Sequence, residues 1–262
     1  MNTLSRPSAQ HPAPSKERLV LLDELRGFAV CCMVFYHGFY SMAALFGLPL
    51  GETLLRFFRP AEPWFAGLFI LISGICCNFS HSNAQRGGKL LLVALAITGV
   101  TMWVVPEEQI IFGILHFLSV SMLLYAALAP ICRRVPVAVG LLVQVFLYLG
   151  FRTVSGGTIF FGIKLPDSLY ATDWLSPLGL HSTAFHSSDY FPLLPWVFVF
   201  FFGAFLGRLA ANGQFPRFFY PSRIPFFALV GRHALLIYVV HQPVILGVCW
   251  LILWLMRGGL PS

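Results

Sequence analysis

Residues 22–38 read LDELRGFAVCCMVFYHG, a largely apolar stretch with Arg26 near its start and His37 near its end. These two residues are eleven positions apart, about three helical turns or about 16 Å, so both side chains project from nearly the same helix face. In a helix that crosses a bilayer, each ionisable group costs about 3 kcal/mol and usually marks a function. The alternative to a functional role is a structural one, in which Arg26 extends to the membrane surface and His37 forms a hydrogen bond with a neighbouring helix.

The composition places the whole chain in a membrane. Of its 262 residues, 58% are hydrophobic and 10% are charged, and the mean hydropathy is +0.79. Apolar runs recur along the chain, and a helix needs about 20 residues to cross the hydrocarbon. The sequence therefore predicts an all-α polytopic membrane protein with about seven transmembrane helices. They are expected at about residues 25–46, 64–78, 90–105, 110–132, 137–151, 193–211 and 229–256, the last bent near Pro243.

Two polar segments define the domain organisation. Residues 1–17 are rich in Pro, Ser and Gln and lack an apolar core, which predicts a disordered cytosolic tail and no cleavable signal. Residues 18–262 are then expected to form a single transmembrane domain. Within it, residues 152–190 are too polar to span and long enough for a structured external loop or lid.

The basic residues predict the orientation in the membrane. Ten of them fall on the side of the amino terminus and five on the opposite side. The ten are Arg6, Lys16, Arg18, Arg86, Lys89, Arg133, Arg134, Arg208, Arg217 and Arg223, and the five are Arg56, Arg59, Arg152, Lys164 and Arg257. Because cytosolic loops carry the excess of Lys and Arg, the amino terminus is expected in the cytosol and the carboxyl terminus outside. The same bias explains the net charge of +7 without a nucleic-acid partner.

The cysteines predict neither disulfides nor a metal site. All six lie inside or at the ends of apolar runs, without a C-x-x-C motif and without the Cys/His spacing of a zinc site. We expect reduced cysteines that pack between helices.

Several titratable side chains are expected to meet in the outer half of the membrane, around a polar cavity. They are His37, Glu62, His116, Asp189 and His241. A histidine can take a proton from an attacking hydroxyl or amine near neutral pH, so His37 and Glu62 are the predicted catalytic pair, with Glu62 or Asp189 orienting the ring. His116, Asp189 and His241 are predicted to bind the acceptor or to support the site. The alternative is that the carboxylates face helix dipoles and that the histidines are bonded between helices.

Two arginines are expected at the cytosolic ends of helices. Arg26 and Arg232 each lie within a turn or two of a predicted helix start, where a guanidinium can pair with a phosphate. Asp23 can hold Arg26 as an i, i+3 pair. The alternative for both arginines is anchoring by the cytosolic charge bias.

Five motifs together resemble a known family. Residues 22–37, 69–74, 113–117, 189–196 and 231–243 are similar to a bacterial member of the heparan-alpha-glucosaminide N-acetyltransferase catalytic-domain family, over about residues 18–245. The opening motif also resembles transmembrane acyltransferases that modify surface glycans.

The resemblance implies transfer of an acyl group, typically acetyl from cytosolic acetyl-CoA, to a sugar or glycan on the outer side of the cytoplasmic (inner) membrane. Arg26 and Arg232 would then bind acyl-CoA. The lysosomal eukaryotic members carry an asparagine at the position matching His37, and their proposed catalytic histidine lies in the following loop. The matching loop here, residues 47–61, contains no histidine, so His37 is the expected acting residue.

Three functions follow from these observations. The first is an integral-membrane acyltransferase that uses acyl-CoA as co-substrate and no metal. The second is a transporter or flippase for a small anionic or glycolipid substrate, in which the same buried groups line a path. The third is a non-catalytic membrane scaffold, in which His37, His116 and His241 are replaceable by apolar residues. Uncovered helix faces are compatible with a homodimer in the bilayer.

Overall fold

The computed structural model describes residues 18–256, and the predicted tail at residues 1–17 lies outside them. Helical segments that are long and apolar enough to cross a membrane number seven in this part of the chain. They are Val20–Leu45, Pro49–Phe79, Asn83–Val104, Ile114–Arg134, Val137–Gly156, Leu193–Ala211 and Ala234–Leu255. The predicted class, an all-α polytopic membrane protein, and the predicted number of spans are therefore confirmed.

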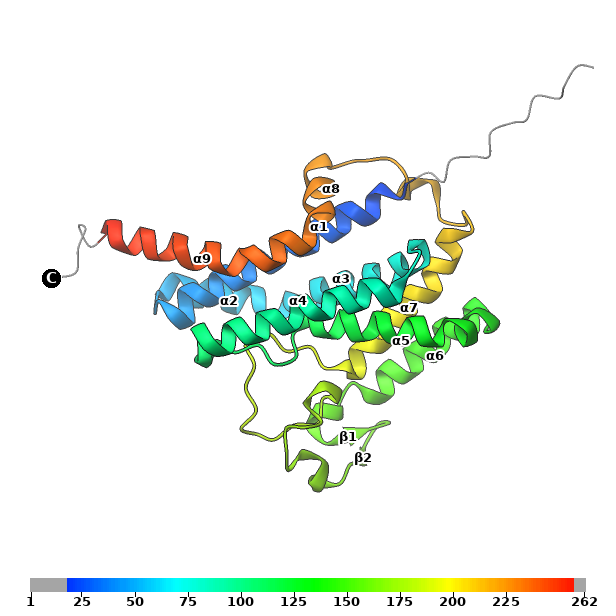
Figure 1. Cartoon of the computed structure of the whole chain (residues 1–262), viewed down its shortest axis with the longest axis horizontal. Coiled ribbons are helices and arrows are strands. Elements are labelled where there is room, and N and C mark those ends of the chain that lie inside the picture. Colours follow the sequence, from blue (N-terminus) through cyan, green and yellow to red (C-terminus); the bar gives the residue numbers. More distant parts are fainter. Residues whose placement is uncertain (1–17, 257–262) are drawn as a thin grey trace, which may run out of the picture.

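The helices form a bundle in which successive spans alternate in direction (Figure 1). They are α1 (Val20–Tyr40), α2 (Pro49–Phe58), α3 (Glu62–Cys76), α4 (Asn83–Val104), α5 (Ile114–Arg134), α6 (Val137–Phe151), α7 (Leu193–Ala211), α8 (Pro225–Arg232) and α9 (Ala234–Met256). A π-helical turn, Ser41–Leu45, extends α1. The side of the bundle where α1 begins is called here the amino-terminal side, and the side where it ends the far side.

The polar segment before α7 lies on the far side of the bundle and is ordered. It contains short 3₁₀ turns and a two-stranded hairpin of β1 (Thr158–Ile159) and β2 (Ile163–Lys164). Figure 1 places this hairpin next to the end of α6.

The segment at residues 47–61, predicted to be a loop, is instead mostly helix α2. Pro49 occupies the first turn, where its missing N–H costs nothing. Glu52 and Arg56 form an i, i+4 ion pair at 3.1 Å, and Leu55 is buried. This helix was not predicted from the sequence because the segment is short and has glycine, proline and charged residues among its apolar residues.

The last predicted span, residues 229–256, is interrupted. His233 leaves the helical conformation (φ −104°, ψ 16°) and separates α8 from α9. Arg232 is therefore the last residue of α8 and lies two residues before the start of α9, at a junction of two helices and not in the first turns of one continuous span. Pro243, the predicted bend, lies inside α9, which continues as helix through it.

Glycine and a carboxylate hold α8 against α1. A Cβ at Gly231 would collide with the backbone carbonyl of Asp23, so the two backbones touch where only glycine fits. Glu24 of α1 accepts hydrogen bonds from the backbone N–H groups of Arg223 (2.7 Å) and Ile224 (2.9 Å) just before α8. These contacts place the end of α8 beside the first turns of α1.

Replacing Gly231 with leucine is therefore expected to destabilise the protein strongly, by about 3 kcal/mol or more, because the backbones cannot separate without losing this packing. The measurement is thermal unfolding of the detergent-solubilised variant. Gly247→Leu in α9 is the matched control, because a Cβ at Gly247 meets nothing within 4 Å. Equal melting temperatures for the two variants would contradict the close crossing.

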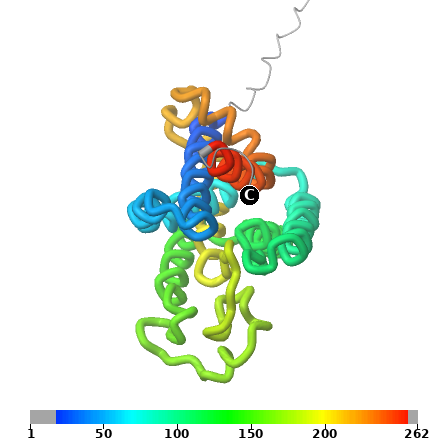
Figure 2. The backbone as a smooth tube through the Cα atoms, turned by 90° about the vertical axis from the view of Figure 1, so that its left-hand side faces the viewer, coloured from blue at the N-terminus to red at the C-terminus, as the bar shows by residue number. Residues whose placement is uncertain are grey.

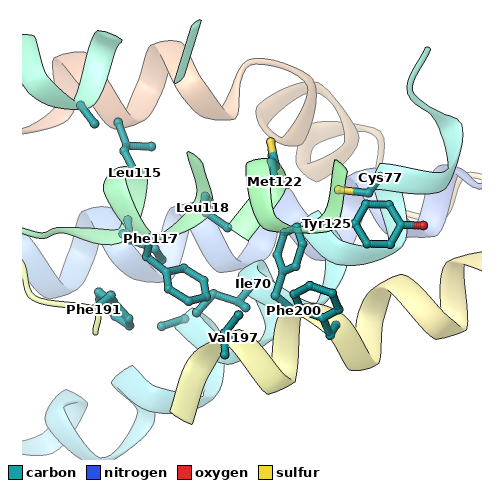
Figure 3. Packing of buried hydrophobic residues seen from close by; sticks show 14 of the residues in the cluster. Ile70, Cys77, Leu115, Phe117, Leu118, Met122, Tyr125, Phe191, Val197 and Phe200 are labelled. Atoms are coloured by element: carbon teal, nitrogen blue, oxygen red, sulfur yellow. The ribbon is translucent and has the colours of Figure 1, made fainter. Parts of the chain in front are cut away.

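The main apolar core lies between α3, α5 and α7. Ile70, Phe117 and Phe200 are fully buried in it, and Figure 3 shows these side chains facing one another. Helix α9 is peripheral and packs mainly against α1, as the view from the far side in Figure 2 shows. The side-chain amide of Gln242 in α9 donates to the Ser41 hydroxyl at 3.0 Å, which links α9 to the π-helical turn.

Candidate active site

A cavity of about 740 Å³ opens in the amino-terminal half of the bundle, between α1, α3, α4, α5 and the α8–α9 junction. Five basic side chains contribute to its lining, together with the carboxylate of Asp23. The five are Arg18, Arg26, Arg86, Lys89 and Arg232. The rest of the lining is mainly apolar. A cavity with this excess of positive charge favours a ligand that carries several negative charges.

Arg26 is the most firmly held of these cations. One guanidinium nitrogen forms the predicted i, i+3 ion pair with Asp23 at 2.9 Å. Another contacts the Cys76 sulfur at 2.8 Å. Asp23 also binds Arg18 at 2.7 Å, so one carboxylate is shared by two guanidinium groups and a net positive charge remains.

A second cavity, of about 220 Å³, lies in the far half of the bundle. His37, Glu62 and Asp189 line it, together with Tyr36 and Ser188. Three predicted site residues from separate parts of the chain therefore share one cavity, whose remaining lining is mainly apolar and aromatic. The side chains of His37 and Glu62 make no hydrogen bond within residues 18–256, so both are free to meet a ligand there.

Asp189 is the best-connected residue of the far cavity. Its Oδ2 accepts hydrogen bonds from the Tyr238 hydroxyl at 2.5 Å and from the backbone N–H of Ile114 at 2.9 Å. The carboxylate thus caps the start of α5, whereas the alternative drawn from the sequence, a carboxylate that faces a helix dipole, pointed to the helix after Asp189. A Cβ at Gly113 would collide with this carboxylate. Burial raises the pKa of Asp189 above its ordinary value, although the two hydrogen bonds lower it.

His241 lies directly behind His37. The two imidazole rings have centroids 5.0 Å apart and planes inclined by 59°. The Nδ1 of His241 lies 2.6 Å from the backbone carbonyl of Tyr238, so this nitrogen carries the proton and donates it. The buried Nε2 is then a hydrogen-bond acceptor without a partner in the described part of the chain.

His116 lies farther back and lines neither cavity. Its Nε2 is 3.1 Å from the Thr98 hydroxyl, and its ring lines a small void that also touches Asp189 and Tyr238. The structure thus places His116 beside Asp189 and away from any ligand in the far cavity.

The comparisons with known proteins decide the family. The family model "Heparan-alpha-glucosaminide N-acetyltransferase, catalytic" matches residues 18–243. The chain belongs to this family. No curated protein and no solved structure matches this chain. Membership in the N-acetyltransferase family, with seven membrane-spanning helices, indicates an integral-membrane transferase of the acetyltransferase type.

The match covers both cavities of this N-acetyltransferase family member. Within residues 18–256, no group of three or more His, Cys, Asp or Glu side chains is placed to hold a metal ion. Arg26 and Arg232 share the amino-terminal cavity, and His37, Glu62 and Asp189 share the far cavity.

Sequence reasoning missed two residues that touch both cavities, Phe69 and Tyr238. Phe69 begins the family motif at residues 69–74 but is apolar like its neighbours, so nothing marked it as a site residue. Tyr238 had one, since it lies three positions before His241 and therefore on the same face of the last helix. The far cavity also borders a polar cluster that sequence reasoning missed, in which Glu108 accepts from the hydroxyls of Tyr40 and Ser188.

Proposed function

We propose that the protein transfers an acyl group, acetyl in the first instance, from acyl-CoA in the amino-terminal cavity to a sugar or glycan acceptor in the far cavity. The observation that supports this is that one basic and one acidic cavity occupy opposite halves of the bundle and share Phe69 and Tyr238. A donor and an acceptor from opposite sides of a membrane can meet only at such a junction.

The amino-terminal cavity suits acyl-CoA in charge and in size. Arginine and lysine side chains bind phosphate groups through charge-assisted hydrogen bonds, and CoA carries several phosphates. A volume of about 740 Å³ is within the usual range for sites of small molecules and cofactors. The charge bias of the sequence makes this side cytosolic, which is where acyl-CoA is available, and we place the protein in a bacterial cytoplasmic (inner) membrane.

His37 is the proposed general base. The acceptor nitrogen or oxygen attacks the thioester carbonyl and gives its proton to His37. The carbon–sulfur bond then breaks, and CoA leaves as a thiolate that is protonated as the imidazolium returns its proton. Glu62, across the same cavity, is proposed to orient the acceptor and to stabilise the imidazolium.

Asp189, His241 and His116 are proposed to support this chemistry. Asp189 fixes Tyr238 by the 2.5 Å hydrogen bond. The unpartnered Nε2 of His241 can accept a hydrogen bond from His37 and so select the tautomer of His37. His116 is proposed to act only through its position beside Asp189.

The decisive experiment uses membranes that contain the protein and acetyl-CoA labelled in the acetyl group. Transfer of label to a sugar or glycan, only when acetyl-CoA is supplied on the amino-terminal side, is the expected result. Inside-out and right-side-out vesicles separate the two directions. No transfer, together with movement of an anionic or glycolipid substrate by the purified protein in liposomes without acyl-CoA, would favour a transporter instead.

Removing one phosphate contact should weaken donor binding. Arg26→Gln is expected to raise KM for acetyl-CoA about 10- to 100-fold, because a hydrogen bond to a charged group contributes about 1.5–3 kcal/mol. The measurement is initial rate against acetyl-CoA concentration in membranes. Arg133→Gln is the matched control, since Arg133 is exposed at the end of α5 and outside the cavity. Equal KM values for the two variants would contradict donor binding in this cavity.

A further inference from the structure

Phe69 of α3 and Tyr238 of α9 form the partition between the two cavities. Each contributes to both linings, whereas the ligand-binding polar groups belong to one cavity or the other. The two cavities therefore adjoin at these two rings, and the shortest route from the donor cavity to the far cavity runs between them.

The two sides of the partition are held differently. Tyr238 is 9% exposed, and its hydroxyl is bonded to Asp189 at 2.5 Å. Phe69 is partly buried and is held by apolar packing against the core between α3, α5 and α7. A phenyl ring without a polar anchor can turn, whereas a tyrosine with a buried hydrogen bond stays in place. Any widening of the junction between the two rings is therefore expected on the Phe69 side.

This geometry limits the size of the acyl group that fits between Phe69 and Tyr238. If the proposed acyl transfer is correct, the thioester carbonyl lies between the rings and the acyl tail points past Phe69 into the far cavity. That cavity, about 220 Å³, must hold the acceptor as well. Each methylene added to the acyl chain then has to displace either the phenyl ring or the acceptor.

We infer that Phe69 determines the acyl-chain length that the enzyme accepts. It holds the site to short acyl groups by closing the opening behind the carbonyl. This inference rests on the proposed acyl transfer and adds to it the size class of the donor.

The test compares acetyl-CoA, propionyl-CoA and butyryl-CoA with one acceptor in membranes. In the unmodified protein, kcat/KM is expected to fall about 10- to 200-fold for an added methylene that does not fit. Phe69→Ala is expected to raise the ratio of butyryl to acetyl transfer at least about tenfold. Phe79→Ala is the matched control, because Phe79 lines the amino-terminal cavity alone, away from the space that the acyl tail would enter. It should alter KM equally for the three acyl-CoA donors and leave the acyl-chain ratio unchanged.

A second variant keeps the inference testable if Phe69→Ala does not fold. Phe69→Leu retains apolar packing at the junction, and thermal unfolding in detergent checks its stability. It should shift the ratio in the same direction by a smaller factor. An unchanged ratio in an active Phe69 variant, or equal use of acetyl-CoA and butyryl-CoA by the unmodified protein, would overturn the role of Phe69. Absence of transfer from every acyl-CoA would instead overturn the proposed function and this inference with it.

Discussion

Replacing His37 with alanine should lower acyl transfer about 10²- to 10⁴-fold, the usual contribution of a general acid–base group. The side chain lines the far cavity, makes no hydrogen bond within residues 18–256, and stands next to the unpartnered Nε2 of His241. Its loss therefore removes the proton acceptor without breaking a bond that holds the helices. The measurement is the rate of label transfer from acetyl-CoA at saturating donor.

The controls for this prediction separate chemistry from folding. His81→Ala changes an exposed histidine in the turn between α3 and α4 and should keep full activity. The His37 variant should melt at the same temperature as the unmodified protein. His241→Ala is expected to cause a smaller loss than His37→Ala, because His241 acts through His37. Full activity of the His37 variant would refute the assignment of the base.

Replacing Asp189 with leucine is expected to cause the largest loss of stability of any change at the site. The leucine would leave the Tyr238 hydroxyl and the Ile114 N–H unpaired in a buried site, and each such group costs about 1–3 kcal/mol. The total, on the order of 4 kcal/mol, is a large part of the stability of an ordinary domain. Thermal unfolding in detergent measures it.

Asp189→Asn separates the hydrogen bonds of this residue from its charge. The amide oxygen still accepts from both donors, so this variant should remain folded. Because burial raises the pKa of Asp189, the folded protein retains the proton more strongly than the unfolded chain. Stability should therefore fall as pH rises from the ordinary carboxyl pKa through the raised value. That fall should be smaller in Asp189→Asn, and an identical pH profile would contradict a buried ionisable carboxylate.

The two cavities show how, in the proposed reaction, one helix would contact both substrates. Arg26 and His37 stand on the same helix, yet the structure assigns them to different cavities. The axial distance expected from the sequence matches this division, because about three turns separate Arg26, at the amino-terminal cavity, from His37, at the far cavity. In the proposed reaction, the acyl group would cross from one cavity to the other at the junction of Phe69 and Tyr238.

The sequence by itself determined the class and the order of the spans. Hydropathy is a local property that needs only about 20 consecutive apolar residues to be read, so the number of crossings follows without knowledge of packing. The Arg26–Asp23 pair was predictable for the same reason, since residues three apart on a helix are neighbours. The family motifs, too, are short and local, and the family match bears them out.

Only the tertiary structure decided which residues share a cavity and where the last helices divide. The interruption at His233 comes directly after the segment that packs against α1, about 200 positions away in the chain. Asp189 caps α5 and holds Tyr238, a role that no local pattern encodes. Phe69 has the same apolar signature as its neighbours in α3, and only packing places its ring at the junction. Cavities arise between helices, so they are properties of side chains that the sequence keeps far apart.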